Sequence, residues 1–249
     1  MKDTDTQRHP EGPIVSRLSI ALLIVVWFGH SAFSQPLAQI PIDTPASGER
    51  HFMILFGGQG DRFRPQTAHT WATFVAVDTT GSSARICEEF TISWLPVNMP
   101  VKPYRLRPEE GRNYGLHETL QIMSTGRHDL SMWGPYEIVP RWYTQAKAYK
   151  CMLDSGAIKY QTLDGNGRRP HVNHCVHAVT YTDPRLRELS APILWYGDLI
   201  TRRVANMIGE ACLLIQPECT HDWILMSLGI QQYELKRRTL NEPILRFLR

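Results

Sequence analysis

Three short apolar runs decide the fold of this chain, and they follow one another closely along the sequence. They are residues 51–56 (HFMILF), 70–77 (TWATFVAV) and 90–95 (FTISWL). β-Branched and aromatic residues, which favour extended backbone, are common in them, and glycine and polar residues separate them. Strands joined by such short connections usually pair antiparallel. The sequence therefore predicts a small antiparallel sheet built from residues 51–95.

The rest of the chain favours helices around this sheet. Apolar spacing with a helical period predicts helices over residues 116–123, 140–153, 175–181 and 196–214. A further helix is expected between an N-cap at Thr220 and Gly229. The prediction is an α+β fold in a single domain, with helices packed on the small antiparallel sheet.

Three other segments carry weaker patterns. Residues 157–163 have the composition of a further strand. Trp133-Gly134-Pro135-Tyr136 reads as a turn, because glycine and proline interrupt regular structure. The basic run Lys236-Arg237-Arg238 is interpreted as the solvated face of a helix.

The N-terminus has the three parts of a secretory signal. A polar segment ends at Arg17, residues 18–29 are apolar apart from Ser19, and the small residues Ala32 and Ser34 follow. We expect cleavage after Ser34, which makes residues 1–34 the signal peptide, 35–50 a linker and 51–249 the domain. The alternative is a retained anchor, but twelve helical residues span only about 18 Å, against a hydrocarbon core of about 30 Å. An exported protein, periplasmic or extracellular, is the prediction.

The net charge and the absence of certain motifs argue against several classes of protein. The net charge of +3 is too small to indicate a nucleic-acid-binding protein. No segment after the signal is apolar enough to span a bilayer. No phosphate-binding loop follows the glycines at 57–60, and no Gly-x-Ser-x-Gly nucleophile elbow occurs. No cofactor is expected.

Five cysteines bear on the compartment. They are Cys87, Cys151, Cys175, Cys212 and Cys219. Cysteines of exported proteins usually pair in disulfides, and an odd number leaves at least one thiol free. The pattern of pairing cannot be deduced from the sequence, so which thiol stays free is open.

Cys175 and His69 are the candidate catalytic pair. Cys175 opens an expected helix, whose N-terminal N–H groups and dipole favour a thiolate. His69 stands at the mouth of an expected strand, from which an imidazole can activate the thiol. A third polar group orients such an imidazole. Ser93 on the following strand is the preferred candidate, with Thr91 and Glu89 as alternatives.

A resemblance rests on the order of these residues. His69 opening a strand (HTWATFVAV), a further strand, and a later Asn-His-Cys-Val-His (173–177) before a helix resemble the circularly permuted papain-like thiol enzymes. That family includes NlpC-type peptidase relatives and lecithin:retinol acyltransferase-like proteins. The resemblance implies a papain-like permuted arrangement, with Cys175 as nucleophile and His69 as base. Two features depart from the family pattern: His174 separates Asn173 from Cys175, and the strand lacks the usual His-Val-Gly-Ile type.

The predicted function follows from the same resemblance, and two alternative functions remain open. The HTWATFV, ISWLP and NHCVHAV segments also resemble an uncharacterised family of exported bacterial proteins, which implies no activity. The predicted activity is hydrolysis or acyl transfer at an amide or ester, on a peptide or lipid substrate. One alternative is a non-catalytic exported binding or structural protein with its cysteines paired. Another is a metal protein that uses the ligand-rich segment with His171, His174, Cys175 and His177.

Overall fold

The structure is a computed structural model that describes residues 48–60, 68–164, 169–187, 197–219 and 221–240. All of these belong to one compact unit, Ile42–Arg249. The predicted signal peptide, almost all of the predicted linker and the Thr220 cap lie outside the described residues. Helices and strands are both well represented, and the predicted α+β class is confirmed.

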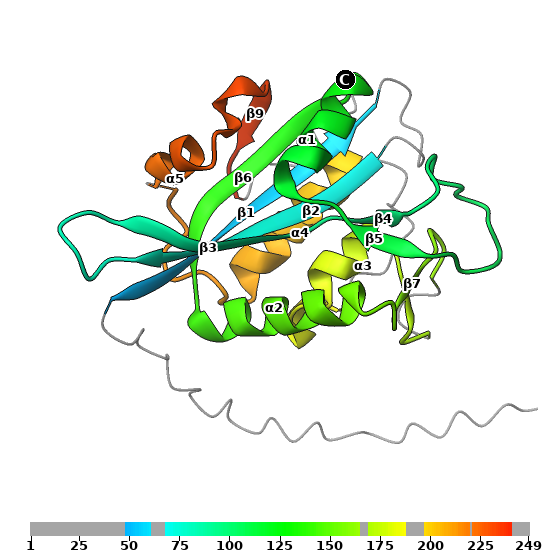
Figure 1. The fold of residues 1–249 in the computed structure, drawn as a ribbon, viewed down its shortest axis with the longest axis horizontal. Coiled ribbons are helices and arrows are strands. Elements are labelled where there is room, and N and C mark those ends of the chain that lie inside the picture. Colours follow the sequence, from blue (N-terminus) through cyan, green and yellow to red (C-terminus); the bar gives the residue numbers. More distant parts are fainter. Residues whose placement is uncertain (1–47, 61–67, 165–168, 188–196, 220, 241–249) are drawn as a thin grey trace, which may run out of the picture. The chain divides into compact units, whose positions relative to one another are not determined.

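A five-stranded sheet forms the centre of the fold (Figure 1). Its order is β3 (Arg85–Ile92), β2 (Ala68–Asp78), β1 (Glu49–Gln59), β6 (Asp129–Ile138) and β9 (Leu235–Arg238). Pairing is antiparallel except between β6 and β9, which run parallel. β1 is nearly all buried because strands flank it on both sides and helices cover it. The predicted antiparallel sheet thus carries one parallel edge strand.

Helices cover both faces of the sheet. On one face, Gly58 of β1 approaches Met123 of α1 (Leu116–Thr125). On the other, Thr70 of β2 hydrogen-bonds Thr201 of α4 (Gly197–Glu210) at 2.6 Å, and α2 (Pro140–Asp154) also packs against the sheet. Each helix turns its apolar stripe inward, as a two-sided sheet requires.

The remaining elements are short. Two small sheets pair β4 (Trp94–Pro96) with β5 (Gly111–Asn113), and β7 (Lys159–Tyr160) with β8 (Val172–Asn173). The short helices are α3 (Cys175–Thr180), α5 (Asp222–Ser227) and the 3-10 turns Pro184–Leu186 and Ile230–Gln232. No helix among the described residues has both the length and the apolar character needed to cross a membrane.

Two predictions from the sequence are wrong. Trp133–Tyr136 is not a turn but the middle of strand β6, where the pairing register with β1 shifts between Met53 and Leu55. This irregularity accommodates Gly134, with φ of 96°, and Pro135, which has no N–H for a regular ladder. The basic run near the C-terminus is not helical either: it forms edge strand β9, and each of its cations pairs with an aspartate.

Candidate functional site

The site forms where strand β2 extends beyond its neighbour β3. β3 pairs with β2 only from Ala72 to Asp78, so the first residues of β2, including His69 and Thr70, have no β3 partner. Helix α3 packs against β2. This brings Cys175, the first residue of α3, to the beginning of β2. Residues far apart in sequence meet here because the sheet leaves one edge open.

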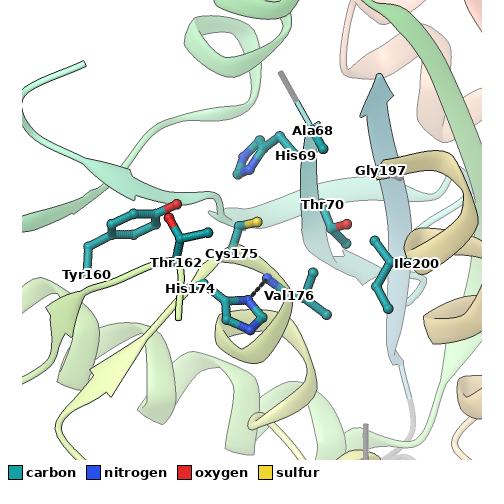
Figure 2. Close-up of a pocket in the computed structure, with 10 residues that line it drawn as sticks. All are labelled: Ala68, His69, Thr70, Tyr160, Thr162, His174, Cys175, Val176, Gly197 and Ile200. Atoms are coloured by element: carbon teal, nitrogen blue, oxygen red, sulfur yellow. Dashed lines mark hydrogen bonds between the residues drawn. The ribbon is translucent and has the colours of Figure 1, made fainter. Parts of the chain in front are cut away.

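Figure 2 shows the pocket that results. His69 and Cys175 both line it, with Tyr160 and Thr162 on one side and Gly197 and Ile200 on the other. A Cβ atom at Gly197 would lie 2.4 Å from the Gly58 carbonyl oxygen, so only glycine lets α4 approach β1 this closely. The pocket therefore holds the two reactive groups that the sequence singles out.

His69 is held by one ring nitrogen and leaves the other available. Its Nε2 lies 2.9 Å from the Ser93 hydroxyl, and Thr119 donates a hydrogen bond to that hydroxyl at 2.8 Å. Its Nδ1 is buried and has no hydrogen-bond partner among the described residues. Burial lowers the pKa of His69 to about 3, because removal from water penalises the charged ring. At neutral pH the ring is therefore uncharged.

The Cys175 sulfur lies among backbone N–H groups. Burial raises the pKa of the Cys175 thiol to about 11, and it outweighs the backbone hydrogen bonds from Thr70, Val176 and Cys175 itself, which favour the thiolate. The resting group is therefore a neutral thiol, although the helix start was expected to favour the thiolate. The residue as a whole is partly exposed and lines the pocket.

His174 caps the N-terminus of α3 with its side chain. Its Nδ1 accepts the N–H groups of Val176 and His177, at 3.2 and 3.4 Å, and so caps α3. An acceptor Nδ1 places the ring proton of neutral His174 on Nε2. The His174 ring therefore already occupies two of the N–H groups at the start of α3.

Tyr160 is a site residue that sequence reasoning missed. It is buried, and its side chain extends toward the pocket beside Cys175 (Figure 2). Burial raises the pKa of its hydroxyl above the ordinary value, so the phenol stays a hydrogen-bond donor. The parallel pairing of β7 with β8 carries Tyr160 next to Asn173, close to the start of α3. No sequence motif marks it.

A second buried cluster lies behind the helix start. Asp164, His174 and His177 place one ligand atom each within 4.8 Å of one another. His177 Nδ1 lies 2.5 Å from Asp164 Oδ2, and His174 Nε2 lies 3.6 Å from the same oxygen. Asp164 also accepts the backbone N–H of His174 at 3.4 Å. The cluster anchors the chain just before and after Cys175.

This cluster could bind a metal only after rearrangement. A metal on His174 Nε2 requires the ring proton to move to Nδ1, where it would face the N–H groups that Nδ1 now accepts. His171 is exposed and stands apart from the cluster, and the group with metal-ligand geometry among the described residues does not include Cys175. The predicted set of His171, His174, Cys175 and His177 is therefore not brought together as four ligands.

The structure also places the other candidates. Ser93 contacts His69, as predicted. Thr91 instead hydrogen-bonds Thr73 at 3.0 Å, and Glu89 is exposed farther along β3. All five cysteines are free thiols in the structure, so none of them is joined to another; disulfide formation stays a prediction.

The comparisons with known proteins add no relative. No family model, no curated protein and no solved structure matches this chain. The resemblance to permuted papain-like thiol enzymes therefore stays a prediction from the sequence.

Proposed function

We propose that this protein is a thiol hydrolase or acyltransferase that acts on an amide or ester bond. The proposal rests on the different surroundings of the two ring nitrogens of His69 and on the pocket that His69 shares with Cys175. Its Nε2 lies 2.9 Å from the Ser93 hydroxyl, its buried Nδ1 has no hydrogen-bond partner among the described residues, and the residue lines the pocket that Cys175 also lines. A general base needs this combination of a fixed ring and a free nitrogen.

The proposed reaction has two stages. The Cys175 thiol gives its proton to His69 Nδ1 as the sulfur attacks the substrate carbonyl carbon, forming a C–S bond. The tetrahedral intermediate collapses, and the leaving amine or alcohol takes the proton from Nδ1. Water, or an acceptor alcohol or amine, then attacks the thioester and regenerates the thiol. Proton transfer accompanies attack, because the resting groups are a neutral thiol and a neutral imidazole.

Two donors are proposed for the carbonyl oxygen. One is the backbone N–H of Cys175, which the His174 cap does not use. The other is the Tyr160 hydroxyl, which stays protonated in its buried position and lines the same pocket. Donors fixed in advance around a developing oxyanion are worth about a hundredfold in rate each.

The test is acylation by p-nitrophenyl acetate, a small activated ester that a narrow pocket admits. We expect a burst of nitrophenol stoichiometric with protein, followed by slower turnover. Cys175→Ala abolishes the burst, whereas Cys151→Ala, which removes an exposed thiol, leaves it intact. Tyr160→Phe lowers the burst rate by about a hundredfold. A burst that survives Cys175→Ala rules the proposal out.

We also propose that the protein is exported, because residues 1–34 have the pattern of a secretory signal. An exported enzyme would meet its substrate outside the cytoplasm. Mass spectrometry of the protein from cells tests it: an N-terminus at Gln35 is expected. The metal alternative predicts zinc or copper bound in stoichiometric amount after purification, which elemental analysis measures.

A further inference from the structure

The loop that joins β4 to β5 carries an unusual set of exposed apolar side chains. Four of the large apolar residues exposed among the described residues lie in it: Val97 (43%), Met99 (43%), Tyr104 (65%) and Leu106 (84%). Figure 1 shows the loop extending outward from the β4–β5 pair. Large apolar side chains gathered on one protruding segment indicate an interaction surface.

Buried residues and backbone hydrogen bonds hold the β4–β5 loop against the domain. Val101 is buried in the hydrophobic core, and Pro103 is buried next to it. The backbone of Arg105 forms two hydrogen bonds. Its carbonyl oxygen accepts one from Gln161 Nε2 at 3.0 Å, and the Arg105 N–H donates one to the Lys102 carbonyl oxygen at 3.1 Å. Tyr104 and Leu106 therefore project from a segment whose neighbours are held by the domain.

The exposed apolar side chains alternate with cations. Residues 97–108 contain Lys102, Arg105 and Arg107 and no acidic residue. Arg105 pairs with Glu109 at 3.3 Å, and Glu110 follows at the base of the loop. Lys102 and Arg107 are exposed and form no ion pair among the described residues. The outer part of the loop thus presents positive charge around Tyr104 and Leu106.

We propose that residues 97–108 dock the protein on the surface of an anionic lipid bilayer. Leu106 and Met99 would enter the boundary between headgroups and acyl chains, Tyr104 would lie at headgroup level, and Lys102 and Arg107 would bind anionic headgroups. A fluid bilayer accepts separate protruding side chains. A protein partner would instead need a matched surface of about 800 Å² on each side.

The loop is tied to the proposed active site. Glu109 and Tyr160 exchange two backbone hydrogen bonds, at 2.9 and 2.8 Å, and Tyr160 lines the Cys175 pocket. Docking through the loop would bring that pocket near the bilayer. Binding itself does not depend on the thiol chemistry, so Cys175→Ala should bind vesicles like the unmodified chain.

The test is cosedimentation of the full chain with vesicles of phosphatidylglycerol and phosphatidylcholine in equal amounts, compared with pure phosphatidylcholine. Any binding through residues 18–29 is common to all variants and cancels in the comparison. Leu106→Ser should weaken partitioning by about tenfold, and Lys102→Gln and Arg107→Gln by about fivefold each. Met226→Ser, at a residue 64% exposed on α5, and Arg85→Gln on β3 are matched controls that should change nothing.

Two further measurements separate a loss of lipid binding from misfolding and from a change in self-association. Thermal melting of each variant should be unchanged, since the replaced side chains are exposed. Sedimentation velocity without vesicles should show no difference in self-association. The proposal is overturned if Leu106→Ser partitions like the unmodified chain, if anionic lipid makes no difference, or if the loop variants alter a dimer instead.

Discussion

His69 Nε2 lies 2.9 Å from the Ser93 hydroxyl, so a neutral group, rather than a carboxylate, orients the proposed base. Thr119 donates to the same oxygen at 2.8 Å and fixes its position. A hydroxyl can accept the Nε2 proton but adds no negative charge beside the ring. Burial leaves His69 uncharged at rest. In the proposed mechanism Ser93 is therefore a positioning residue.

Replacing Ser93 tests that role. Ser93→Ala should slow acylation by p-nitrophenyl acetate by about a hundredfold, since a ring free to rotate loses its alignment with the thiol. Ser93→Asn, which restores a hydrogen-bond acceptor, should recover part of the rate. Thr91→Val is the matched control, because Thr91 bonds Thr73 and not His69. Equal rates for Ser93→Ala and the unmodified protein would contradict the assignment.

Cys175 should be slow to alkylate in the absence of substrate. Burial raises its pKa to about 11, so only a small fraction is thiolate near neutral pH. Its labelling by iodoacetamide should trail that of the exposed thiol of Cys151 and rise steadily with pH. Mass spectrometry of the labelled peptides follows both sites in one sample. Preferential labelling of Cys175 at neutral pH would mean a resting thiolate–imidazolium pair instead.

Acid should destabilise the fold through His69 and His174. Burial lowers the pKa of each to about 3, against 6.5 for an ordinary histidine. Between those values the unfolded chain binds more protons than the folded one, so stability present above pH 6.5 is lost as pH falls. Each ring contributes a slope of up to about 1.4 kcal/mol per pH unit.

Urea unfolding as a function of pH measures this slope. His174→Asn keeps an N-cap acceptor and removes the titrating ring. The slope of the free energy of unfolding against pH should therefore decrease by about 1.4 kcal/mol per pH unit. An unchanged slope would show that His174 does not stay neutral in the folded protein.

The contact between Asp164 and His177 should contribute strongly to stability. Both side chains are buried and lie 2.5 Å apart, so removing one partner takes this hydrogen bond away from a buried group. Asp164→Asn should cost about 3 kcal/mol of unfolding free energy. Asp154→Asn, in the exposed pair with Lys150, should cost about 0.5 kcal/mol or less. If the double variant Asp164→Asn with His177→Asn costs the sum of the two single changes, the contact contributes nothing.

Much of the sheet follows from local sequence, because apolar β-branched runs favour strands wherever they pack. β1 and β2 extend the predicted runs by only a few residues. β6 could not be predicted, since Gly134-Pro135 is typical of a turn and only pairing with β1 accommodates it in a strand. The edge strand β9 depends on parallel pairing with β6, which no local pattern indicates.

Some residues of the candidate site could be predicted from the sequence, and others could not. Cys175, His69 and Ser93 follow from the order of helix and strands, and the structure brings them to one place. Tyr160 and Asp164 reach it through tertiary pairing of short segments, which carry no motif. The neutral state of the thiol also depends on tertiary burial, which overrides the helix N-terminus that the sequence does predict.

The most direct test of thiol catalysis is to find which residue carries the acyl group. Brief exposure to p-nitrophenyl acetate, acid quenching and peptide mass spectrometry would locate it. We predict a single acetyl group on Cys175, formed at least about a hundredfold more slowly in His69→Gln. Acetylation spread over Cys87, Cys151 and Cys212, at rates that do not change in His69→Gln, would contradict the assignment of Cys175 and His69.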